Sequence, residues 1–437
     1  MRKFKRGDRD QLLVLPPSLN DWLPEDHLAR FILEVLERLD LSKFYAVYES
    51  ERGGQPPYDP AVILGLLLYA YTTGNMSSRR IEQATWTDIA CRFIAANLHP
   101  DHDTIAYFRK RHALLIVDTF AQIVEVAMKA KMVRLGHVSL DGTKVRANAS
   151  KSKRRTQSQL ERERDETKRL FGELLEEAEL VDAEEDDEFG KGNKGDSLPT
   201  PLKTKEKRLQ VIEEAIKALQ EQQAEQKEED PTGIQKHRRE LKKGKPEVPK
   251  INTTDTDSRT MRFSNGLFDE GYNTQIVVDD EAGIIIAADA TQEGGDKRLL
   301  LPMILQVEKN TGWLPDNVTA DTGYYNESHI RDPRLKTVEF FVKPAKKKTA
   351  KPTTRVKPDP FSDVMRERLE TGIGQALYHL RMRLVEPVFG SIKHARGFRQ
   401  LLLRGLQGAK TEWTLICSAH NILAMFSRSS SLTALLS

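Results

Sequence analysis

Apolar positions recur every three or four residues near the start of the chain, which is the spacing of an amphipathic helix. The segment EDHLARFILEVLERL has this pattern and follows a basic stretch that begins MRKFKR. We therefore expect a basic N-terminal arm and helix over residues 1–45. The most apolar run, AVILGLLLYAY at 61–71, is too short to span a bilayer and predicts a buried helix.

The same periodicity predicts further helices between residues 46 and 130. One ends at Gly74, the next begins at a serine pair suited to capping, and a long one follows the acidic cap of PDHD. Basic residues in this region, among them Arg109 and Arg111, suit a helix-turn-helix that reads DNA. A small bundle with solvated basic faces fits the pattern equally well. We expect a helical DNA-binding domain at 46–130.

The pattern changes to strict alternation at GHVSLDGTKVRANAS. Apolar residues two apart predict a short buried strand, and that strand is expected to end on the carboxylate of Asp141. Gly142 then leaves space beside the carboxylate, and Lys144 and Arg146 add positive charge. We place the first strand of a catalytic core at 131–150.

Residues 151–250 are much more highly charged. Leu209, Ile212, Ile216 and Leu219 recur at helical steps, and a similar leucine-bearing stretch precedes them. We predict two charged helices that fold back on each other in a coiled-coil-like insertion, joined by FGKGNKGDSLPTP. Such a segment is more often a solvated structural insertion than a binding surface for a partner or DNA.

Strands and helices alternate over residues 251–437. GYNTQIVVDD and GIIIAADATQ predict a hairpin, DKRLLLPMILQVEKNTG a helix, and DNVTADTGYYN a strand that ends on Asp321. Another strand, KTVEFFVKP, precedes a Lys/Pro-rich loop at 343–357, and a later helix carries Glu386. This order predicts an α/β fold with a mixed sheet flanked by helices.

Three carboxylates therefore stand at the ends of predicted elements, namely those of Asp141, Asp321 and Glu386. An acid at a strand tip beside glycine leaves room for a metal and a phosphate, and two such strands side by side would bring the aspartates together. Oxygen ligands without His or Cys favour Mg²⁺ or Mn²⁺, and two such ions support phosphoryl transfer. Taken singly, each acid would more often be a turn residue, so the case depends on their order and context.

The helix around Glu386 reads LYHLRMRLVEPVFGSIKHARGF. Arg383 precedes Glu386 by three positions and Lys393 follows it by seven, so the three side chains can share one face of a helix. A solvated ladder of ion pairs would look similar. Pro387 removes a backbone donor, so the helix is expected either to kink or to restart at this point.

Composition limits the setting without identifying a partner. The length of 437 residues suits about two or three domains. The net charge of +3 makes the chain only mildly basic. Its cysteines, Cys91 and Cys417, form no metal or redox motif, as in a reduced cytosol. The N-terminus lacks an apolar signal core. We expect a cytoplasmic protein without a membrane partner.

The motif order now becomes informative. SLDGTKVRANAS, the GYNTQIVVDD region, VTADTGYYN and RLVEPVFGSIKHARGF together resemble bacterial insertion-sequence transposases of the DDE class, and YDPAVILGLLLYAYTTGNMSSRRIEQ resembles their helical N-terminal domain. The resemblance implies an RNase H-like core and metal-dependent cleavage and strand transfer of DNA at two Mg²⁺ or Mn²⁺ ions. It also implies that Asp141, Asp321 and Glu386 are the catalytic acids and the metal ligands.

One departure from the family concerns the last acid, which many relatives place in a Y-(2)-R-(3)-E-(6)-K pattern. Counting from Glu386, Lys393 fits, whereas Met382 and His379 stand at the Arg and Tyr positions. The expected DNA contacts are Lys393, Arg383, Lys144, Arg146, Arg109 and Arg111. The aromatic residues after the second acid, Tyr324 and Tyr325, are expected to pack near the site.

The resemblance also implies the partners. They are double-stranded DNA, as terminal inverted repeats and as target, and further copies of the chain in a dimeric or larger synaptic complex, with the protein at the bacterial nucleoid while bound. One alternative is a transposase-derived DNA-binding regulator without catalysis. A less favoured one is a tyrosine recombinase that uses Tyr324 or Tyr325, because the final forty residues contain no Tyr.

Overall fold

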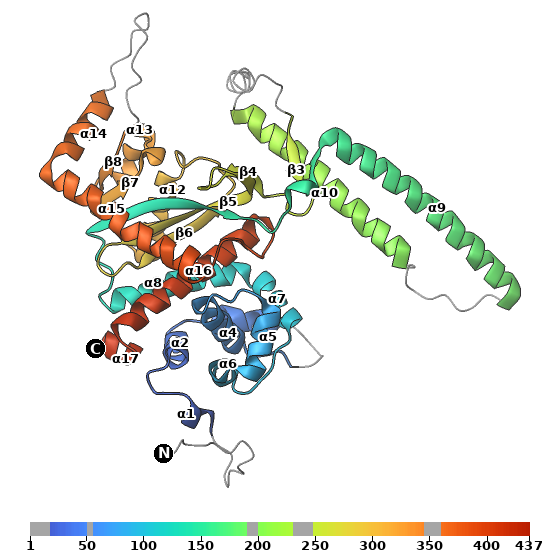
Figure 1. Cartoon of the computed structure of the whole chain (residues 1–437), viewed down its shortest axis with the longest axis horizontal. Helices are drawn as coiled ribbons and strands as arrows, with labels where there is room; N and C mark the ends of the chain where they lie inside the picture. The colour runs from blue at the N-terminus through green and yellow to red at the C-terminus, as the bar shows by residue number, and fades with distance from the viewer. Residues whose placement is uncertain (1–17, 50–55, 190–199, 230–247, 345–359) are drawn as a thin grey trace, which may run out of the picture. The chain divides into compact units, whose positions relative to one another are not determined.

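The computed structural model of the chain (Figure 1) describes residues 18–49, 56–189, 200–229, 248–344 and 360–437. Most of the basic arm, the linker between the two charged helices and most of the Lys/Pro-rich loop lie outside the described residues. The chain divides into two compact units. The first consists of residues 1–145, 273–403 and 407–437, and the second of 146–272 and 404–406.

The N-terminal part of the first unit is helical, as its periodicity predicts. Its helices are α1 (Leu19–Trp22), α2 (Leu28–Glu37), α3 (Ser42–Glu49), α4 (Pro60–Thr72), α5 (Ser78–Thr87), α6 (Ile89–Ile94), α7 (His102–Arg111) and α8 (Ala113–Lys129). Helix α4 is buried on nearly all sides, and the side chain of Asp59 caps it by accepting from the Ala61 N–H at 2.8 Å. Asp88 separates α5 from α6 and caps α6 through the Cys91 N–H at 3.0 Å.

The sheet of the first unit contains β1 (His137–Arg146), β5 (Phe268–Asp279), β6 (Ile285–Thr291), β7 (Asn317–Ala320) and β8 (Glu339–Val342). Strand β5 lies next to β1, followed by β7 and then β8, while β6 pairs with β5. The β5–β6 pair is antiparallel, whereas β1–β7 and β7–β8 are parallel. The fold is therefore mixed α/β with a mixed sheet, as predicted. Its RNase H-like character stays a prediction.

Helices cover this sheet. They are α12 (Leu300–Thr311), α14 (Pro360–Glu370), α15 (Gly372–Gly390) and α16 (Gly405–Arg428). The short helices α13 (Glu327–Ile330) and α17 (Leu432–Leu436) pack instead on α12 and α2. Helix α12 packs on β6, and α15 packs on β7 and β8 (Figure 1). Burial on α16 is nearly continuous, and the Trp413 indole N–H donates to the Gln275 carbonyl of β5 at 3.0 Å. In the described part of the chain, no helix is long and apolar enough to cross a membrane.

A buried polar network ties the helical region to α16. The Tyr71 hydroxyl of α4 donates to Glu412 Oε1 at 3.1 Å and accepts from Arg109 Nη1 at 3.2 Å. Oε2 of Glu412 accepts the backbone N–H groups of Leu402 and Leu403 at 2.7 and 2.9 Å. All three network side chains are buried. The carboxyl is thus surrounded by donors, as a buried acid requires.

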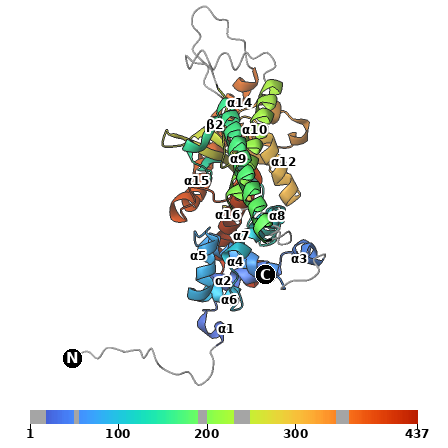
Figure 2. The same cartoon turned by 90° about the vertical axis from the view of Figure 1, so that its right-hand side faces the viewer.

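The second unit contains β2 (Arg154–Thr156), α9 (Gln157–Phe189), α10 (Thr200–Glu229), β3 (Lys250–Asn252) and β4 (Arg259–Arg262). Helices α9 and α10 run antiparallel and side by side (Figures 1 and 2). Leu160 of α9 packs with Ile212, Ile216 and Leu219 of α10. The predicted insertion lies within this unit, which also includes residues 251–272. The coiled-coil description of the pair stays a prediction.

Candidate active site

Asp141 and Asp321 occupy equivalent places on two neighbouring parallel strands. Leu140 of β1 is the register partner of Ala320 of β7, and each aspartate is the next residue along its chain. Adjacent strands lie about 4.8 Å apart, so the two carboxyl groups are neighbours. The prediction that this strand ends at Asp141 is wrong, because β1 continues to Arg146. Strand β5 remains beside it over these residues, and Thr274 Oγ1 of β5 donates to the Thr143 carbonyl at 2.7 Å.

Buried hydrogen bonds pin the register of these two strands. Thr319 Oγ1 lies 2.8 Å from the hydroxyl oxygen of Ser139 and 2.9 Å from Nε2 of His137. All three side chains are buried between β1 and β7. A slip of one residue would turn these polar groups to the opposite face, so the contacts hold Asp141 and Asp321 at the same edge of the sheet.

A third carboxylate, which the sequence pattern does not reveal, lies beside this pair. Asp296 follows β6 in the loop before α12, and its Oδ1 accepts from Asn273 Nδ2 at 2.7 Å and Gln275 Nε2 at 3.2 Å. Lys144 Nζ lies 3.8 Å from the same oxygen. The charge of Asp296 contributes to a raised pKa at Asp141, after burial as the main cause. Three acids therefore share one electrostatic environment.

The space beside Gly142, which was predicted to be open, is occupied by neighbouring side chains that exclude a Cβ atom at this position. A Cβ at this position would come within 2.8 Å of the Tyr324 hydroxyl and would overlap the Gln275 side-chain amide. Tyr324 is buried and donates a hydrogen bond to Gln275 Oε1. Glycine thus lets this Tyr–Gln pair pack under the carboxylates, which places Tyr324 in a packing role, as expected, rather than on an exposed surface.

Arg381 of α15 forms an ion pair with Asp141. Its Nη1 lies 3.1 Å from Asp141 Oδ2, and both side chains are largely buried. Burial raises the pKa of Asp141 to about 6, and the Asp321 and Asp296 charges add to the rise, while the Gly142 N–H and Arg381 oppose it. Arg381 and Lys144 pair with two of the three acids, Asp141 and Asp296, so the charge of Asp321 favours an additional cation at the site.

The position of Arg381 explains the departure from the family pattern. Two residues separate Tyr378 from Arg381, and the guanidinium carbon lies 5.6 Å from the centroid of the Tyr378 ring. The Y-(2)-R part of the pattern is therefore present at Tyr378 and Arg381. Four residues separate Arg381 from Glu386, whereas the family pattern has three, so counting back from Glu386 misses this Tyr–Arg pair by one position. That count reaches Met382, and Arg383, the basic residue next to it that was predicted as a DNA contact, is exposed.

Glu386 lies away from this cluster in the structure. Five residues at about 100° each place it about 140° around α15 from Arg381. Accordingly its side chain is exposed, while the neighbouring Val385 is buried. Helix α15 is continuous through Pro387, so it does not restart there, and a π-helical turn, Ser391–Ala395, follows it. The role of Glu386 as third acid stays a prediction.

The remaining predicted cations fall into two groups. Lys393 is near the site: its Nζ donates to Thr143 Oγ1 and, at 3.0 Å, to the Lys144 carbonyl of β1. Burial, with Arg399 and Lys144 nearby, lowers the pKa of Lys393 to about 8. Lys144 faces Asp296, as described above. Arg146 is exposed and belongs to the second unit.

Arg109 and Arg111, on the last turn of α7, are both engaged by the protein. Arg109 is 3% exposed, and besides Tyr71 its guanidinium donates to the Met76 carbonyl and Ser78 Oγ, each at 2.8 Å. This burial corrects the expected DNA contact at Arg109 to a structural role. Arg111 donates to the Val47 carbonyl at 3.3 Å and lies over the Tyr48 ring at 4.8 Å. Arg111 is half-exposed, and its predicted contact with DNA stays a prediction.

The donor chemistry of the cluster fits a hard divalent cation, although the full ligand set is not assembled. The acids offer carboxylate oxygens only, which suit Mg²⁺ or Mn²⁺. Within the described residues, no group of three or more His, Cys, Asp or Glu side chains is arranged to hold a metal. Asp141 and Asp321 are the two positions that the strand register brings together.

Comparison with known families finds two matches. The family described as "Transposase domain (DUF772)" matches residues 17–111, and the family described as "Transposase DDE domain" matches residues 230–422. Asp321 and Glu386 lie inside the second match, whereas Asp141 lies between the two. No curated protein and no solved structure matches the chain.

Proposed function

The chain belongs to the insertion-sequence transposases of the DDE class, and from this premise we propose that it cuts DNA at the ends of its own element and joins those ends to target DNA. The observation that carries the proposal is the register of β1 and β7, in which Leu140 opposite Ala320 sets Asp141 beside Asp321. A pair of acids at the carboxyl edge of parallel strands suits phosphoryl transfer on a polyanion.

Asp141 and Asp321 would hold Mg²⁺ or Mn²⁺, two ions in the mechanism proposed here. A bound divalent ion supplies Lewis-acid stabilisation of the reacting phosphate. The protein's own contribution is orientation: Arg381 fixes Asp141 at 3.1 Å, and Asn273 and Gln275 fix Asp296. Lys144 and Lys393, beside the acids, would contact DNA phosphates.

Two candidates remain for the third acid. Motif order favours Glu386, which is exposed, whereas position favours Asp296, whose charge acts on both Asp141 and Tyr324. Metal ligands usually have partners that orient them, and Asp296 already has two amide donors. We propose Glu386 as the acid that joins the site when DNA is bound, and Asp296 as a carboxylate that supports the ion at all times.

The proposed partners follow from the family. They are double-stranded DNA, as inverted repeats and target, and a second copy of the chain in the synaptic complex. The helical region at 46–130 would read the DNA end, with Arg111, Arg146 and Arg383 as further phosphate contacts. The core of β1, β5, β6, β7 and β8 with its flanking helices would be RNase H-like, since its sheet combines an antiparallel β5–β6 pair with parallel β1–β7 and β7–β8 pairs.

The experiment compares cleavage of a labelled DNA end by the purified chain and single variants in Mg²⁺. Asp141→Asn and Asp321→Asn are expected to abolish cleavage while retaining DNA binding. The matched control is Asp316→Asn, because Asp316 is exposed and precedes β7 at the strand end opposite Asp321. It should cleave like the wild type.

Two further variants identify the third acid. Loss of cleavage in Glu386→Gln with residual cleavage in Asp296→Asn supports the assignment above, and the reverse pattern transfers the role to Asp296. Cleavage that survives Asp141→Asn, or that proceeds in EDTA, refutes the metal proposal. DNA binding by the wild type without cleavage in Mg²⁺ or Mn²⁺ would favour the non-catalytic regulator.

A further inference from the structure

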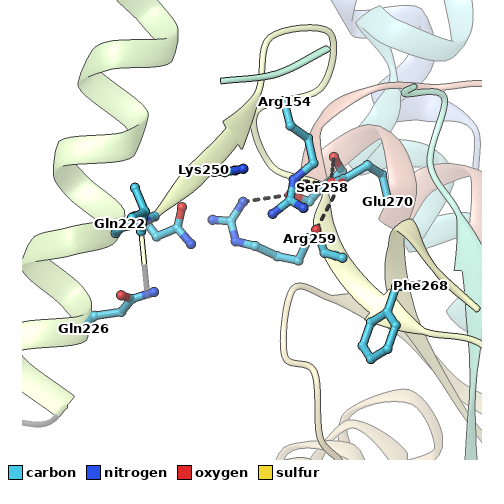
Figure 3. Close-up of a pocket in the computed structure, with 11 residues that line it drawn as sticks. Arg154, Gln222, Gln226, Lys250, Ser258, Arg259, Phe268 and Glu270 are labelled. Atoms are coloured by element: carbon cyan, nitrogen blue, oxygen red, sulfur yellow. Dashed lines mark hydrogen bonds and ion pairs between the residues drawn. The ribbon is translucent and has the colours of Figure 1, made fainter. Parts of the chain in front are cut away.

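A basic pocket lies within the second unit, whereas the acids described above belong to the first. Its volume is about 400 Å³, and residues from β2, α10, β3, β4 and the start of β5 line it (Figure 3). This volume lies in the range of about 300–1,000 Å³ that is typical of pockets for small ligands. The polar lining residues are Arg154, Gln222, Gln226, Lys250, Ser258, Arg259, Thr260 and Glu270.

The lining has a positive balance. Arg154, Lys250 and Arg259 are its cations, and Glu270 is its one acid. Glu270 is already engaged, since it accepts from Thr260 Oγ1 at 2.8 Å and pairs with Arg154 Nε at 3.3 Å. Two positive charges therefore remain in excess, and they come from separate strands that converge on one space. This arrangement selects an anion.

Arg259 is held in place before any ligand arrives. Its Nη1 donates to the carbonyl oxygens of Thr256 and Ser258 at 2.8 and 3.1 Å. Burial lowers the pKa of Arg259, while the charges of Asp257, Glu225 and Asp255 oppose that shift and so favour the charged guanidinium. Figure 3 shows this side chain reaching from β4 toward Gln222 on α10. A guanidinium fixed in this way binds phosphate with little loss of side-chain entropy.

Neutral groups around the cations match a nucleobase. Oε1 of Gln222 is buried and lacks a hydrogen-bond partner within the described residues, and Gln226 lies one helical turn further along α10. Phe268 is 57% exposed and lines the same pocket. Side-chain amides recognise base edges, and an exposed aromatic ring offers a stacking surface for any base.

We propose that this pocket binds one unstacked nucleotide of a DNA strand. The phosphate would contact Arg259 and Lys250, the base would stack on Phe268, and its edge would meet Gln222. The inference rests on the proposed function for the presence of DNA, and it adds a single-strand site in the second unit. Arg154 and its partner Glu270 would form the floor that keeps Arg259 in position.

The test measures affinity of the full-length chain for a labelled single-stranded 20-nucleotide oligomer and for the matching duplex by fluorescence anisotropy, without divalent metal. Lys250→Gln and Phe268→Ala are the main variants because both side chains are exposed, so neither change threatens folding. Lys217→Gln and Leu267→Ala are matched controls, since these residues are 79% and 64% exposed and do not line the pocket.

We expect Phe268→Ala to weaken single-strand binding by about 5- to 150-fold, the range for loss of one base stack. Lys250→Gln should weaken it by about tenfold and reduce the salt dependence by about one phosphate contact. Duplex affinity should change less than twofold in either variant. Equal losses on single strand and duplex, or no loss on the single strand, overturn the proposal.

Two arms separate the remaining outcomes. Adenosine monophosphate that displaces the oligomer at micromolar concentration would assign the pocket to a free nucleotide and overturn the DNA-strand proposal, whereas displacement only at millimolar concentration supports it. Cleavage of the labelled DNA end by the wild type is measured in parallel. If the proposed catalysis fails, wild-type cleavage is absent while the affinity differences between the wild type and the pocket variants remain. If the pocket proposal fails, Phe268→Ala and Lys250→Gln bind the single strand as the wild type does.

Discussion

Replacing Arg109 by methionine is expected to lower the free energy of unfolding rather than to weaken DNA binding directly. The side chain is 3% exposed and makes three hydrogen bonds, to Tyr71, Met76 and Ser78. Methionine keeps most of the apolar stem but supplies no donor. The buried acceptors then lose their partner, and Glu412 loses the positive charge that lowers its pKa against the effect of burial.

The cost can be estimated from these contacts. Each acceptor left without a donor costs about 1–3 kcal/mol, and removing one member of a buried charge network costs about 3–5 kcal/mol in total. These contributions overlap, so we expect the free energy of unfolding to fall by about 3–5 kcal/mol. The matched control is Arg80→Met on α5, which is exposed and should change it by less than about 0.5 kcal/mol.

Urea unfolding followed by far-ultraviolet circular dichroism measures the difference between the two variants. DNA affinity is measured in parallel, at a temperature where both proteins are folded. An Arg109→Met protein with wild-type unfolding and clearly reduced DNA affinity would refute the reasoning, because it would mean that the guanidinium is available to phosphate. A loss of stability with unchanged affinity of the folded protein supports it.

Three further predictions concern other parts of the chain. Arg381→Gln should lower the cleavage rate by about 100-fold, more than Arg383→Gln does, since Arg381 contacts Asp141 and Arg383 is exposed. Cleavage is measured at a temperature where circular dichroism shows both variants to be folded, and equal effects would contradict the assignment. Burial, with Arg396 nearby, lowers the pKa of His420 to about 4, so the folded state favours the neutral imidazole. The unfolded chain therefore binds the proton more readily, and the free energy of unfolding should fall by up to about 3 kcal/mol as pH drops from about 6.5 to 4. Denaturant titrations of the wild type and His420→Gln across this range check it, and a wild-type slope retained in the variant would assign the effect to other groups. Leu160→Ala should cost about 2–5 kcal/mol by opening a cavity between α9 and α10, measured by urea unfolding; a change below about 0.5 kcal/mol would mean that the two helices are not packed there.

Periodicity predicts the elements well where one face is buried. Val138 and Leu140 indicated β1, and the apolar run ending in Ala320 indicated β7, so the neighbourhood of Asp141 and Asp321 follows from a local pattern and the parallel pairing of two strands. The strand end was missed because pairing with β5 extends β1, and pairing between distant segments leaves little trace in local sequence.

The residues missed at the site depend on tertiary contacts. Asp296 lies in the loop GGDKR, which has no periodicity, and only its position beside Asn273 and Gln275 identifies it. Arg381 was detectable from its spacing to Tyr378, but the count began at Glu386 and an extra residue intervenes. The DNA contact predicted for Arg109 rested on the rule that a charged residue at the end of a helix is normally solvated, and this arginine is instead buried.

The network of Arg109, Tyr71 and Glu412 also has a consequence for synthesis of the chain. Arg109 leaves the ribosome about 300 residues before Glu412, an interval of about 15–60 s at about 5–20 residues per second. During that time the helical region carries a cation whose buried carboxylate partner does not yet exist. We expect this region to dock only when α16 emerges, so the nascent chain would acquire its native N-terminal packing only after the whole sheet of the first unit has been synthesised.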